Sequence, residues 1–311
     1  MEIHDLIVVL GPTACGKTAL AVQMAASMDA EIIGADSRQV YRGLDIGTGK
    51  DLAEYNVNDQ EIPYHLIDIL DPGQDYNAWQ FQRDALDACI DIQERGKLPL
   101  ICGGTGLYIE SFLLNYPFNP VEPDANLRAE LEELSTEELA ARVDEFRPGL
   151  SDEDRNNRHR VMRMLETELS KPKETPDVLD YSIKNPIVFG IDMPREIVRQ
   201  RISDRLKSRL DDGMIAETEK LLRSGVDKNW LFKLGLEYRF LSQYILGELT
   251  YDEMYSGLET SIHRFAKRQM TWFRRMEKRG IKIHWIDGML GMVEKLSSVS
   301  QIVSRKAHEG H

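Results

Sequence analysis

The sequence predicts an α/β fold in which a largely parallel sheet forms the core and a helical subdomain is inserted. Three observations support this prediction. Short apolar runs alternate with segments of helical period, as in parallel sheets with crossover helices. A glycine-rich motif, GPTACGKT at residues 11–18, follows the first apolar run and precedes a helix-favouring segment. Proline-rich stretches flank a charged, helix-favouring region in mid-chain.

The strands and helices of the core are predicted from the pattern of apolar residues and from the residues that end each element. Strands are expected at Leu6–Leu10, Glu31–Ala35, His65–Ile69, Leu98–Cys102, Ile187–Ile191 and Ile281–Ile286. Helices are expected at Ala19–Met28, Asn77–Arg95, Leu107–Leu114, Pro194–Asp212, Ile215–Leu222 and Tyr251–Arg279. Glycines 96, 213, 225 and 280 stand where helix C-termini are expected.

The proline-rich stretches YPFNPVEPD and KPKETPD set the predicted domain boundaries. We expect residues 1–114 to form the first part of a P-loop NTPase-like core, residues 115–185 a helical insertion, and residues 186–311 the second part of the core with C-terminal helices. We found no internal repeat.

Composition narrows the class of protein. The 311 residues are 42% hydrophobic, which is normal for a globular protein with a buried core. The cysteines Cys15, Cys89 and Cys102 are odd in number and have no C-x-x-C spacing, which argues against disulfides or zinc and fits a reducing cytoplasm. Without a run of about 18 apolar residues or a cationic leader, we expect a cytoplasmic protein with no membrane partner. A monomer is compatible with the sequence, which does not determine the oligomeric state.

The net charge of −13 disfavours nucleic-acid binding by the surface as a whole, but basic residues cluster locally. Arg155, Arg158, Arg160 and Arg163 have no acid among them. Residues 264–282 hold eight basic residues against Glu277 alone. Such basic faces can bind RNA, and solvated helix faces are the alternative for either cluster.

The motif at residues 11–18 matches G-x-x-x-x-G-K-[ST], with the strand before it and the helix after it that a phosphate loop needs. Gly11 and Gly16 let the backbone wrap an anion, Lys17 supplies a cation, and the Thr18 hydroxyl ligates Mg²⁺. A turn without a ligand would explain the glycines but not Lys17 beside Thr18. Cys15 is expected to be a passive small residue, not a reactive thiol.

A kinase or ATPase would also need a metal-binding carboxylate at the end of an apolar strand. KLPLICGG ends in glycines, whereas HLIDIL contains Asp68, so the kinase alternative is weakened but stays open. Asp36 and Ser37 follow the second predicted strand, where the ligand crevice of an open α/β sheet lies. A helix N-cap is the alternative role for this pair.

Four motifs, in this order and spacing, resemble the tRNA dimethylallyltransferase family, also called tRNA isopentenyltransferases: GPTACGKT, ADSRQVYRGLDIGT, GGTGLY and RFAKRQMTWFRR. The resemblance covers about residues 5–287. It implies that the loop binds the diphosphate of dimethylallyl diphosphate. It also implies that the acceptor is the exocyclic amine of the adenosine immediately 3′ of the anticodon, with the tRNA anticodon stem-loop as partner. An adenylate isopentenyltransferase, a small-molecule kinase and a non-catalytic RNA-binding module are the alternatives.

The resemblance also assigns site residues, position by position. The catalytic group comprises Asp36 as general base with Lys17 and Thr18, and Mg²⁺ is the cofactor. Donor binding falls on Gly11, Pro12, Thr13, Ala14, Cys15, Gly16, Lys17, Thr18 and Arg239. Contacts to tRNA fall on Asp36, Ser37, Arg38, Gln39, Thr105, Arg128, Arg158, Arg160, Lys267, Arg268 and Gln269.

Local readings compete with several of these assignments. Thr105 could be a helix cap, Arg128 could be an exposed helical charge, and the aromatics of RFAKRQMTWFRR are expected in the core. WLFKLGLEYRFL departs from the family pattern, which usually has a Gly-Tyr pair with an arginine upstream, so the cation at this place is unassigned between Lys233 and another residue. We further predict that the anticodon loop is splayed between the core and the insertion, with Arg38 or Gln39 near a flipped base.

Overall fold

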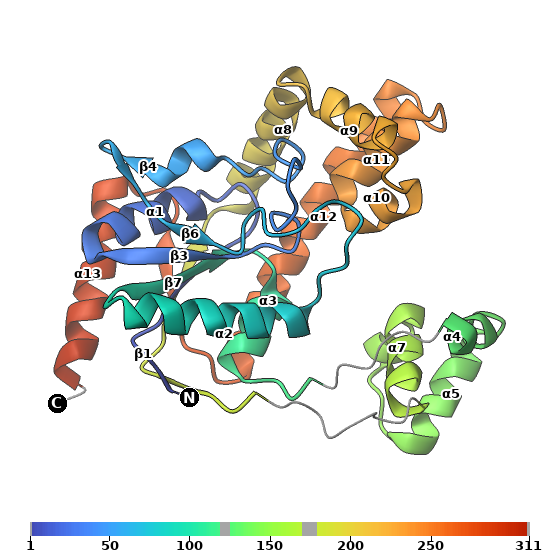
Figure 1. The fold of residues 1–311 in the computed structure, drawn as a ribbon, viewed down its shortest axis with the longest axis horizontal. Coiled ribbons are helices and arrows are strands. Elements are labelled where there is room, and N and C mark those ends of the chain that lie inside the picture. The colour runs from blue at the N-terminus through green and yellow to red at the C-terminus, as the bar shows by residue number, and fades with distance from the viewer. Residues whose placement is uncertain (1, 119–124, 170–178, 310–311) are drawn as a thin grey trace. The chain divides into compact units, whose positions relative to one another are not determined.

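The computed structural model describes residues 2–118, 125–169 and 179–309 (Figure 1). The chain divides into two compact units, one formed by Met1–Asn115 with Tyr181–His311 and the other by Tyr116–Asp180. The prolines at 120 and 123 and the KPKETPD stretch lie outside the described residues. Within the described part of the chain, no helix is both long enough and apolar enough to cross a membrane.

The larger unit is built on a six-stranded parallel sheet, which confirms the predicted fold class. The strand order is β10-β9-β2-β7-β3-β6. The strands are β2 (Ile7–Leu10), β3 (Ala30–Ala35), β6 (Tyr64–His65), β7 (Leu98–Gly103), β9 (Ile187–Asp192) and β10 (Ile283–Asp287). Parallel strands end at the same edge of a sheet, so the loops that follow β2, β3 and β7 are neighbours.

Helices cover both faces of this sheet because the crossovers reverse direction. The chain passes from β2 over β7 to β3 through α1 (Lys17–Met28), then returns to β7 through α2 (Ala78–Glu94). Right-handed crossovers in opposite directions place their helices on opposite faces, as Figure 1 shows for α1 and α2. Helix α3 (Gly106–Leu113) packs beside α2, and α13 (Met292–Glu309) packs beside α1.

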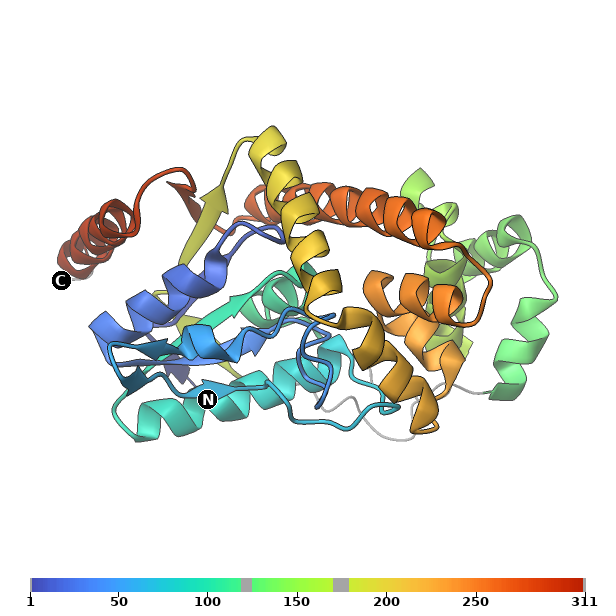
Figure 2. The ribbon, with the colours of Figure 1, turned by 90° about the horizontal axis from the view of Figure 1, so that it is seen from above.

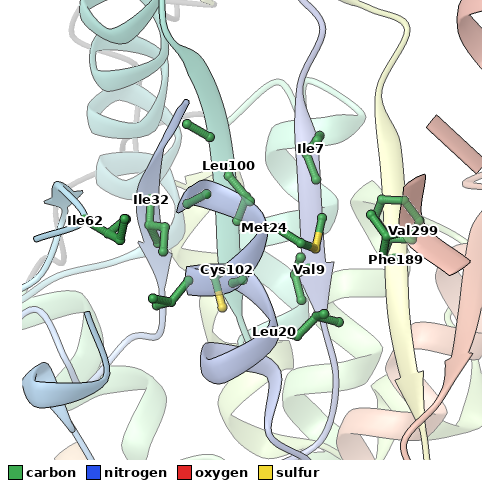
Figure 3. Close-up of a cluster of buried hydrophobic side chains, with 14 of the residues drawn as sticks. Ile7, Val9, Leu20, Met24, Ile32, Ile62, Leu100, Cys102, Phe189 and Val299 are labelled. Carbon is green, nitrogen blue, oxygen red and sulfur yellow. The ribbon is translucent and has the colours of Figure 1, made fainter. Parts of the chain in front are cut away.

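The core under α1 fills the space between this helix and the sheet (Figure 3). Leu20 and Met24 of α1 pack on alternate residues of β2, and Phe189 of β9 and Val299 of α13 extend the cluster. All of these side chains are buried. The sheet is covered by helices on both faces, and its strands are therefore apolar on both sides.

A second layer of helices stands beyond the C-terminal edge of the sheet. It comprises α8 (Arg195–Asp211), α9 (Met214–Arg223), α10 (Lys228–Leu234), α11 (Leu236–Ile245) and the long α12 (Tyr251–Lys278). Helix α12 packs against α8 and α11 (Figure 2). Its start is fixed by a capping box in which Thr250 accepts from the Glu253 N–H, and Glu253 accepts from the Thr250 N–H.

Shorter elements complete this unit. Strand β1 (Glu2–His4) pairs in parallel with β8 (Ser182–Lys184), and β4 (Asn56–Val57) pairs antiparallel with β5 (Gln60–Glu61) after a 3₁₀ turn, η1 (Leu52–Tyr55). Glycines 96, 213, 225 and 280 have positive φ directly after helices, as predicted.

The strand predicted at His65–Ile69 is wrong over most of its length. Only Tyr64–His65 pair with β3, because Leu66 and Asp68 adopt φ of 61° and 56°. Asp68 turns toward Lys50, whose buried ammonium also bonds Asp45. The ion pair of Asp68 with Lys50 therefore replaces strand pairing over the second half of this apolar run. Helices α10, α11 and α13 were not predicted.

The smaller unit is a bundle of short helices: α4 (Ala125–Glu132), α5 (Thr136–Phe146), α6 (Asp152–Arg155) and α7 (Arg158–Leu169). Its core is one apolar cluster of Leu131, Leu139, Ala140, Val143, Val161 and Leu165. Ser135 starts α5 with a capping box to Glu138. A small core of its own makes this insertion a separate packing unit.

Candidate active site

A cavity of about 380 Å³ opens at the C-terminal edge of the sheet, where the loops after β2, β3 and β7 meet α8 and α12. Most of its wall comes from four segments that are distant in sequence. The residues from these segments are Thr13, Ala14, Gly16, Lys17, Thr18, Asp36, Ser37, Arg38, Gln39, Cys102, Gly103, Gly104, Thr105, Gly106, Leu107, Ile262, Phe265, Arg268, Gln269 and Trp272. Ligand sites of open α/β sheets lie at this edge.

The phosphate loop has the backbone that its glycines permit. Gly16 adopts φ 82° immediately before α1 begins at Lys17, and Ala14 adopts φ 62°. A Cβ on Gly11 would lie 2.6 Å from the Cys15 sulfur, so this position needs glycine. The N–H groups of the first turn of α1 therefore border the cavity together with Lys17 and Thr18.

Burial raises the pKa of the Cys15 thiol, although the Lys17 charge opposes the effect. A buried thiol that stays protonated is a poor nucleophile. Cys15 therefore acts as a packing residue behind the loop, in line with the prediction.

Asp36 stands in a tight turn after β3. Its Oδ1 accepts from the Arg38 backbone N–H at 3.0 Å, which fixes the carboxylate orientation. Residues 37–40 form a turn and no helix follows, so the N-cap alternative for Asp36 and Ser37 is wrong. Within the described residues Oδ2 makes no hydrogen bond, which leaves it available to a substrate.

The cap alternative for Thr105 also fails. Thr105 stands at the N-cap position of α3 but makes no capping bond. Its Oγ1 accepts from the Ser37 N–H at 3.1 Å instead. Thr105 therefore holds the Asp36 turn in place from the neighbouring strand end.

Gly103 and Gly104 form the floor between the phosphate loop and Asp36. A Cβ on Gly103 would lie 2.1 Å from the Ala35 oxygen, and one on Gly104 would lie 2.4 Å from Gln269 Nε2. Strand β7 separates β2 from β3, so the loops after those two strands start about 10 Å apart, twice the usual interstrand distance. The two glycines therefore let the Ala35 backbone and the Gln269 amide pack closely against this floor.

Gln269 of α12 ties two loops together. Its Oε1 accepts from the Thr13 N–H at 2.9 Å, and its Nε2 donates to the Gly104 oxygen at 2.9 Å. Both ends of the buried amide are used in this bridge within the protein, and the contact of Gln269 with tRNA stays a prediction.

The aromatic residues of RFAKRQMTWFRR were predicted to lie in the core, and this is wrong for two of the three. Phe273 is buried in the core as expected, but Phe265 and Trp272 line the cavity. The Arg275 guanidinium lies 3.8 Å from the Trp272 ring centroid and bonds Glu110 at 2.7 Å, which holds the ring in place. The cavity thus has an aromatic wall.

Arg38 and Gln39 are both held by the protein. Arg38 pairs with Glu237 of α11 at 2.9 Å and lies 5.0 Å from the Phe265 ring centroid. Gln39 donates to the Gly49 oxygen at 3.0 Å. Each side chain is oriented at the cavity wall before any ligand binds.

The GLDIGTGK segment, which follows the Asp36 turn, is shaped by one carboxylate. Glu217 of α9 accepts from the backbone N–H groups of residues 45, 46 and 47 at 2.8–3.0 Å. It also accepts from the Tyr238 hydroxyl at 2.8 Å. This network brings Thr48 and Gly49 to the cavity.

Arg239 was predicted to bind the donor, and this role stays a prediction. The side chain is exposed on α11 and Arg239 is absent from the cavity wall, as is Lys233 of α10. Sequence reasoning missed Arg205 of α8, which lines the cavity. The signal was present, because arginines at 205 and 209 fall among the apolar positions 198, 202 and 206.

Two further basic residues of α12 were predicted to contact tRNA, and they differ in their surroundings. Arg268 lines the cavity, and its guanidinium is 6.0 Å from the Phe265 centroid. Lys267 is exposed on α12 and does not reach the cavity wall.

In the smaller unit, the predicted tRNA-binding arginines also have internal partners. Arg128 pairs with the buried Glu166, Arg158 donates to carbonyl oxygens at the end of α4, and Arg160 pairs with Asp154. These arginines therefore organise the bundle, and their contact with tRNA stays a prediction.

Acidic residues of the cavity include Asp51 and Glu54 beside Asp36. Burial and the Asp51 charge raise the pKa of Glu54, whereas Arg205 and Lys17 lower it. Asp68, the candidate kinase carboxylate, pairs with Lys50 and does not line the cavity. The end of β7 offers only Gly103 and Gly104.

The comparisons with known proteins agree over nearly the whole chain. The IPP transferase family model matches residues 39–276, and an isopentenyl transferase model matches residues 4–61. The chain is 49% identical over 301 residues to tRNA dimethylallyltransferase 2 of Bacteroides fragilis, covering 97% of this chain and 98% of that protein. It is 47% identical over 306 residues to tRNA dimethylallyltransferase 1 of Parabacteroides distasonis, with 98% and 100% covered.

Solved structures give the same picture. The full-length tRNA isopentenylpyrophosphate transferase of Bacillus halodurans superposes with a TM-score of 0.72 at 31% identity, covering 98% of this chain and 97% of that one. A eukaryotic dimethylallyltransferase acting on tRNA has a TM-score of 0.76 at 22% identity, with 96% and 77% covered, a likeness that concerns the fold alone.

Proposed function

The chain belongs to the IPP transferase family and prenylates adenosine in tRNA, and we propose the donor, the acceptor atom and the residues that perform the transfer. The donor is dimethylallyl diphosphate. The acceptor is the exocyclic amine of the adenosine 3′-adjacent to the anticodon, and diphosphate is released. One observation carries this proposal: a phosphate loop and the Asp36 carboxylate border the same cavity, with an aromatic wall beside them.

The parts of the cavity match the parts of the donor. The diphosphate fits the cationic region formed by the phosphate loop, Lys17 and Arg205. The dimethylallyl group is apolar and fits against Phe265, Trp272 and Leu107, where contact with apolar surface is favourable. The donor then spans from the loop toward Asp36.

The reaction exchanges one bond for another at the first carbon of the prenyl group. The adenine nitrogen forms a bond to this carbon, while the carbon–oxygen bond breaks and its electron pair leaves with diphosphate. The nitrogen loses a proton, which Asp36 Oδ2 accepts. General base assistance is typically worth about 10²–10⁴-fold in rate.

Negative charge grows on the departing diphosphate, and this chain offers fixed groups to stabilise it. The N–H groups at the start of α1 and the Lys17 ammonium are in place before reaction, so they need little reorganisation. The loop therefore serves a leaving group, and no phosphoryl group is transferred.

Mg²⁺ fits this site because it is usually bound by few protein groups together with substrate phosphates. Among the described residues no group of three acidic, cysteine or histidine side chains could hold a metal, so we assign the Thr18 hydroxyl as the protein ligand. When bound, Mg²⁺ would supply charge neutralisation for the leaving group.

Recognition of tRNA is part of the proposal. Adenine must leave the base stack to reach a cavity lined by Asp36, and the oriented Arg38 and Phe265 at its wall can stack on an extruded base. We assign the helical unit and the exposed Lys267 to contacts with the anticodon stem-loop. The buried, free cysteines suit a cytoplasmic enzyme, and we propose a monomer.

The experiment compares three acceptors with labelled dimethylallyl diphosphate and Mg²⁺: unmodified tRNA, the isolated anticodon stem-loop, and AMP. We expect label on the base in tRNA and in the stem-loop, and none on AMP. Equal transfer to AMP would overturn loop recognition and indicate an adenylate isopentenyltransferase. Hydrolysis of ATP with phosphorylation of a small molecule would indicate a kinase.

A further inference from the structure

Arg209 of α8 occupies a position where a core residue is expected. The buried face of this helix runs through Val198, Ile202 and Leu206, and Arg209 continues it at the next turn. The residue is 9% exposed. Arginine is rarely buried to this extent unless it is paired, so the position calls for a partner.

The guanidinium has no such partner within the described residues. Arg209 Nη2 is buried without a hydrogen bond, and the side chain forms no ion pair. Glu237, an acid that lines the same small pocket as Arg209, already bonds Arg38. Burial and the neighbouring Arg205 charge lower the pKa of Arg209 to about 10, which still leaves the group charged at neutral pH.

Arg205 and Arg209 lie side by side over Gly49. Arg209 Nη2 is 1.5 Å, and Arg205 Nη2 is 3.0 Å, from the position that a Cβ on Gly49 would occupy. Glycine at 49 therefore makes room for two adjacent guanidinium groups. Two like charges in a partly buried place destabilise one another unless an anion lies between them.

A small pocket connects this pair to the main cavity. Its volume is about 20 Å³, and its wall includes Arg209, Arg205 and Thr13 of the phosphate loop. Arg205, Thr13, Glu237 and Ile262 line both spaces. A pocket of this size holds one water-sized group, such as one phosphoryl oxygen, and not a whole phosphate.

The two spaces share a cationic end. The charges of Lys17 and Arg205 both act on the Cys15 thiol and on the Glu54 carboxyl, so these cations lie at the same end of the cavity. The diphosphate placed there by the proposed function can extend one terminal oxygen into the small pocket. Thr13 of the phosphate loop lines the small pocket, so the phosphate held by that loop, and not a tRNA backbone phosphate, is the one placed beside it.

We propose that Arg209, next to Arg205, binds a terminal oxygen of the donor diphosphate and so completes the cationic end of the site opposite the phosphate loop. This inference rests on the proposed function, since it takes the donor to be a prenyl diphosphate. It assigns to α8 the cation that the WLFKLGLEYRFL segment does not supply.

The test uses the full-length protein and Arg209→Met, which keeps a long side chain but removes the charge. We expect the KM for dimethylallyl diphosphate, and the Kd for inorganic diphosphate measured by calorimetry, to rise about 10- to 100-fold. That is the loss expected for one or two hydrogen bonds from a charged donor. The KM for tRNA should stay within twofold.

Arg201→Met is the matched control, because it makes the same change at an exposed arginine of α8 and should leave all three constants within twofold. Arg209→Lys keeps the charge and should restore part of the diphosphate affinity. It also serves as the test if Arg209→Met does not fold. In the absence of ligand, Arg209→Met should melt no lower than the wild type, because an unpaired buried charge has been removed.

Unchanged diphosphate affinity in both Arg209 variants would overturn the inference. If the wild type still transferred the prenyl group in that case, the proposed function would be upheld. An equal rise of the KM for donor and for tRNA would also overturn the inference. If the wild type bound diphosphate through Arg209 but transferred no prenyl group, the inference would stand and the proposed reaction would fail.

Discussion

Gln269 offers a quantitative test of how the site is assembled. Its amide makes two hydrogen bonds of 2.9 Å, to the Thr13 N–H and to the Gly104 oxygen, and its side chain is buried. Each neutral hydrogen bond contributes about 1 kcal/mol, and the buried Gly104 oxygen left without a partner costs about as much again, whereas Thr13 borders the cavity. We therefore expect Gln269→Ala to destabilise the protein by about 3 kcal/mol, and to lower the melting temperature by roughly 5–10 °C.

The same substitution should weaken donor binding, because the Thr13 N–H belongs to the phosphate loop. We expect the Kd for diphosphate to rise about tenfold, equivalent to about 1.4 kcal/mol, and tRNA affinity to change less than about twofold. Gln269→Glu keeps the acceptor for the Thr13 N–H but loses the donor to the Gly104 oxygen. Its Kd for diphosphate should therefore lie between those of the wild type and of Gln269→Ala. Calorimetry with diphosphate and filter binding with the anticodon stem-loop measure these quantities. Loss of tRNA affinity with normal diphosphate binding would refute the bridge.

Two further predictions concern stability. Burial alone would raise the pKa of Glu166, but hydrogen bonds from Arg128 and Arg163 lower it below the ordinary 4.5. The contribution of the ionised Glu166 to the free energy of unfolding is therefore complete above pH 4.5 and is lost as the pH falls below that value. Glu166→Gln should cost about 2 kcal/mol at pH 7 and flatten the melting temperature between pH 5 and 3, and an unchanged acid slope would contradict this. Gly103→Ala places a Cβ 2.1 Å from the Ala35 oxygen and should cost about 3 kcal/mol, whereas Gly291→Ala makes only an ordinary contact; equal melting temperatures for the two variants would contradict the close approach of β7 and β3.

The sequence allowed the core of the fold to be predicted where local signals and packing agree. Strands β2, β3, β7 and β9 lie within one residue of the predicted runs, because central parallel strands are apolar on both sides. Helix α2 begins after Asn77, at the start of the predicted helix, and the Asn77 side chain caps it. The family resemblance is confirmed by the comparisons.

Other features depend on tertiary contacts that no local pattern reports. The chain breaks between α10 and α11 at Gly235, where the Arg38 side chain leaves little room for a Cβ. Asp68 left its predicted strand to pair with Lys50. Each partner is distant in sequence, so periodicity alone could not predict either feature.

The candidate site shows the same division. The phosphate loop and Asp36 were found from motifs, because each motif carries its own chemistry in a short segment. Arg205 and the aromatic wall were missed, since a charged or aromatic residue at helical spacing looks like a surface or core position. Only the packing of α8 and α12 against the sheet edge shows that they line the cavity.

We propose that Asp36 takes the proton while the phosphate loop holds the leaving diphosphate. The most direct test of this proposal is single-turnover transfer from labelled dimethylallyl diphosphate to a saturating anticodon stem-loop, comparing the wild type with Asp36→Asn. We expect a fall of about 10²–10⁴-fold in the transfer rate, with stem-loop and diphosphate affinities within a few-fold of the wild type. A transfer rate within about threefold of the wild type would contradict the proposal.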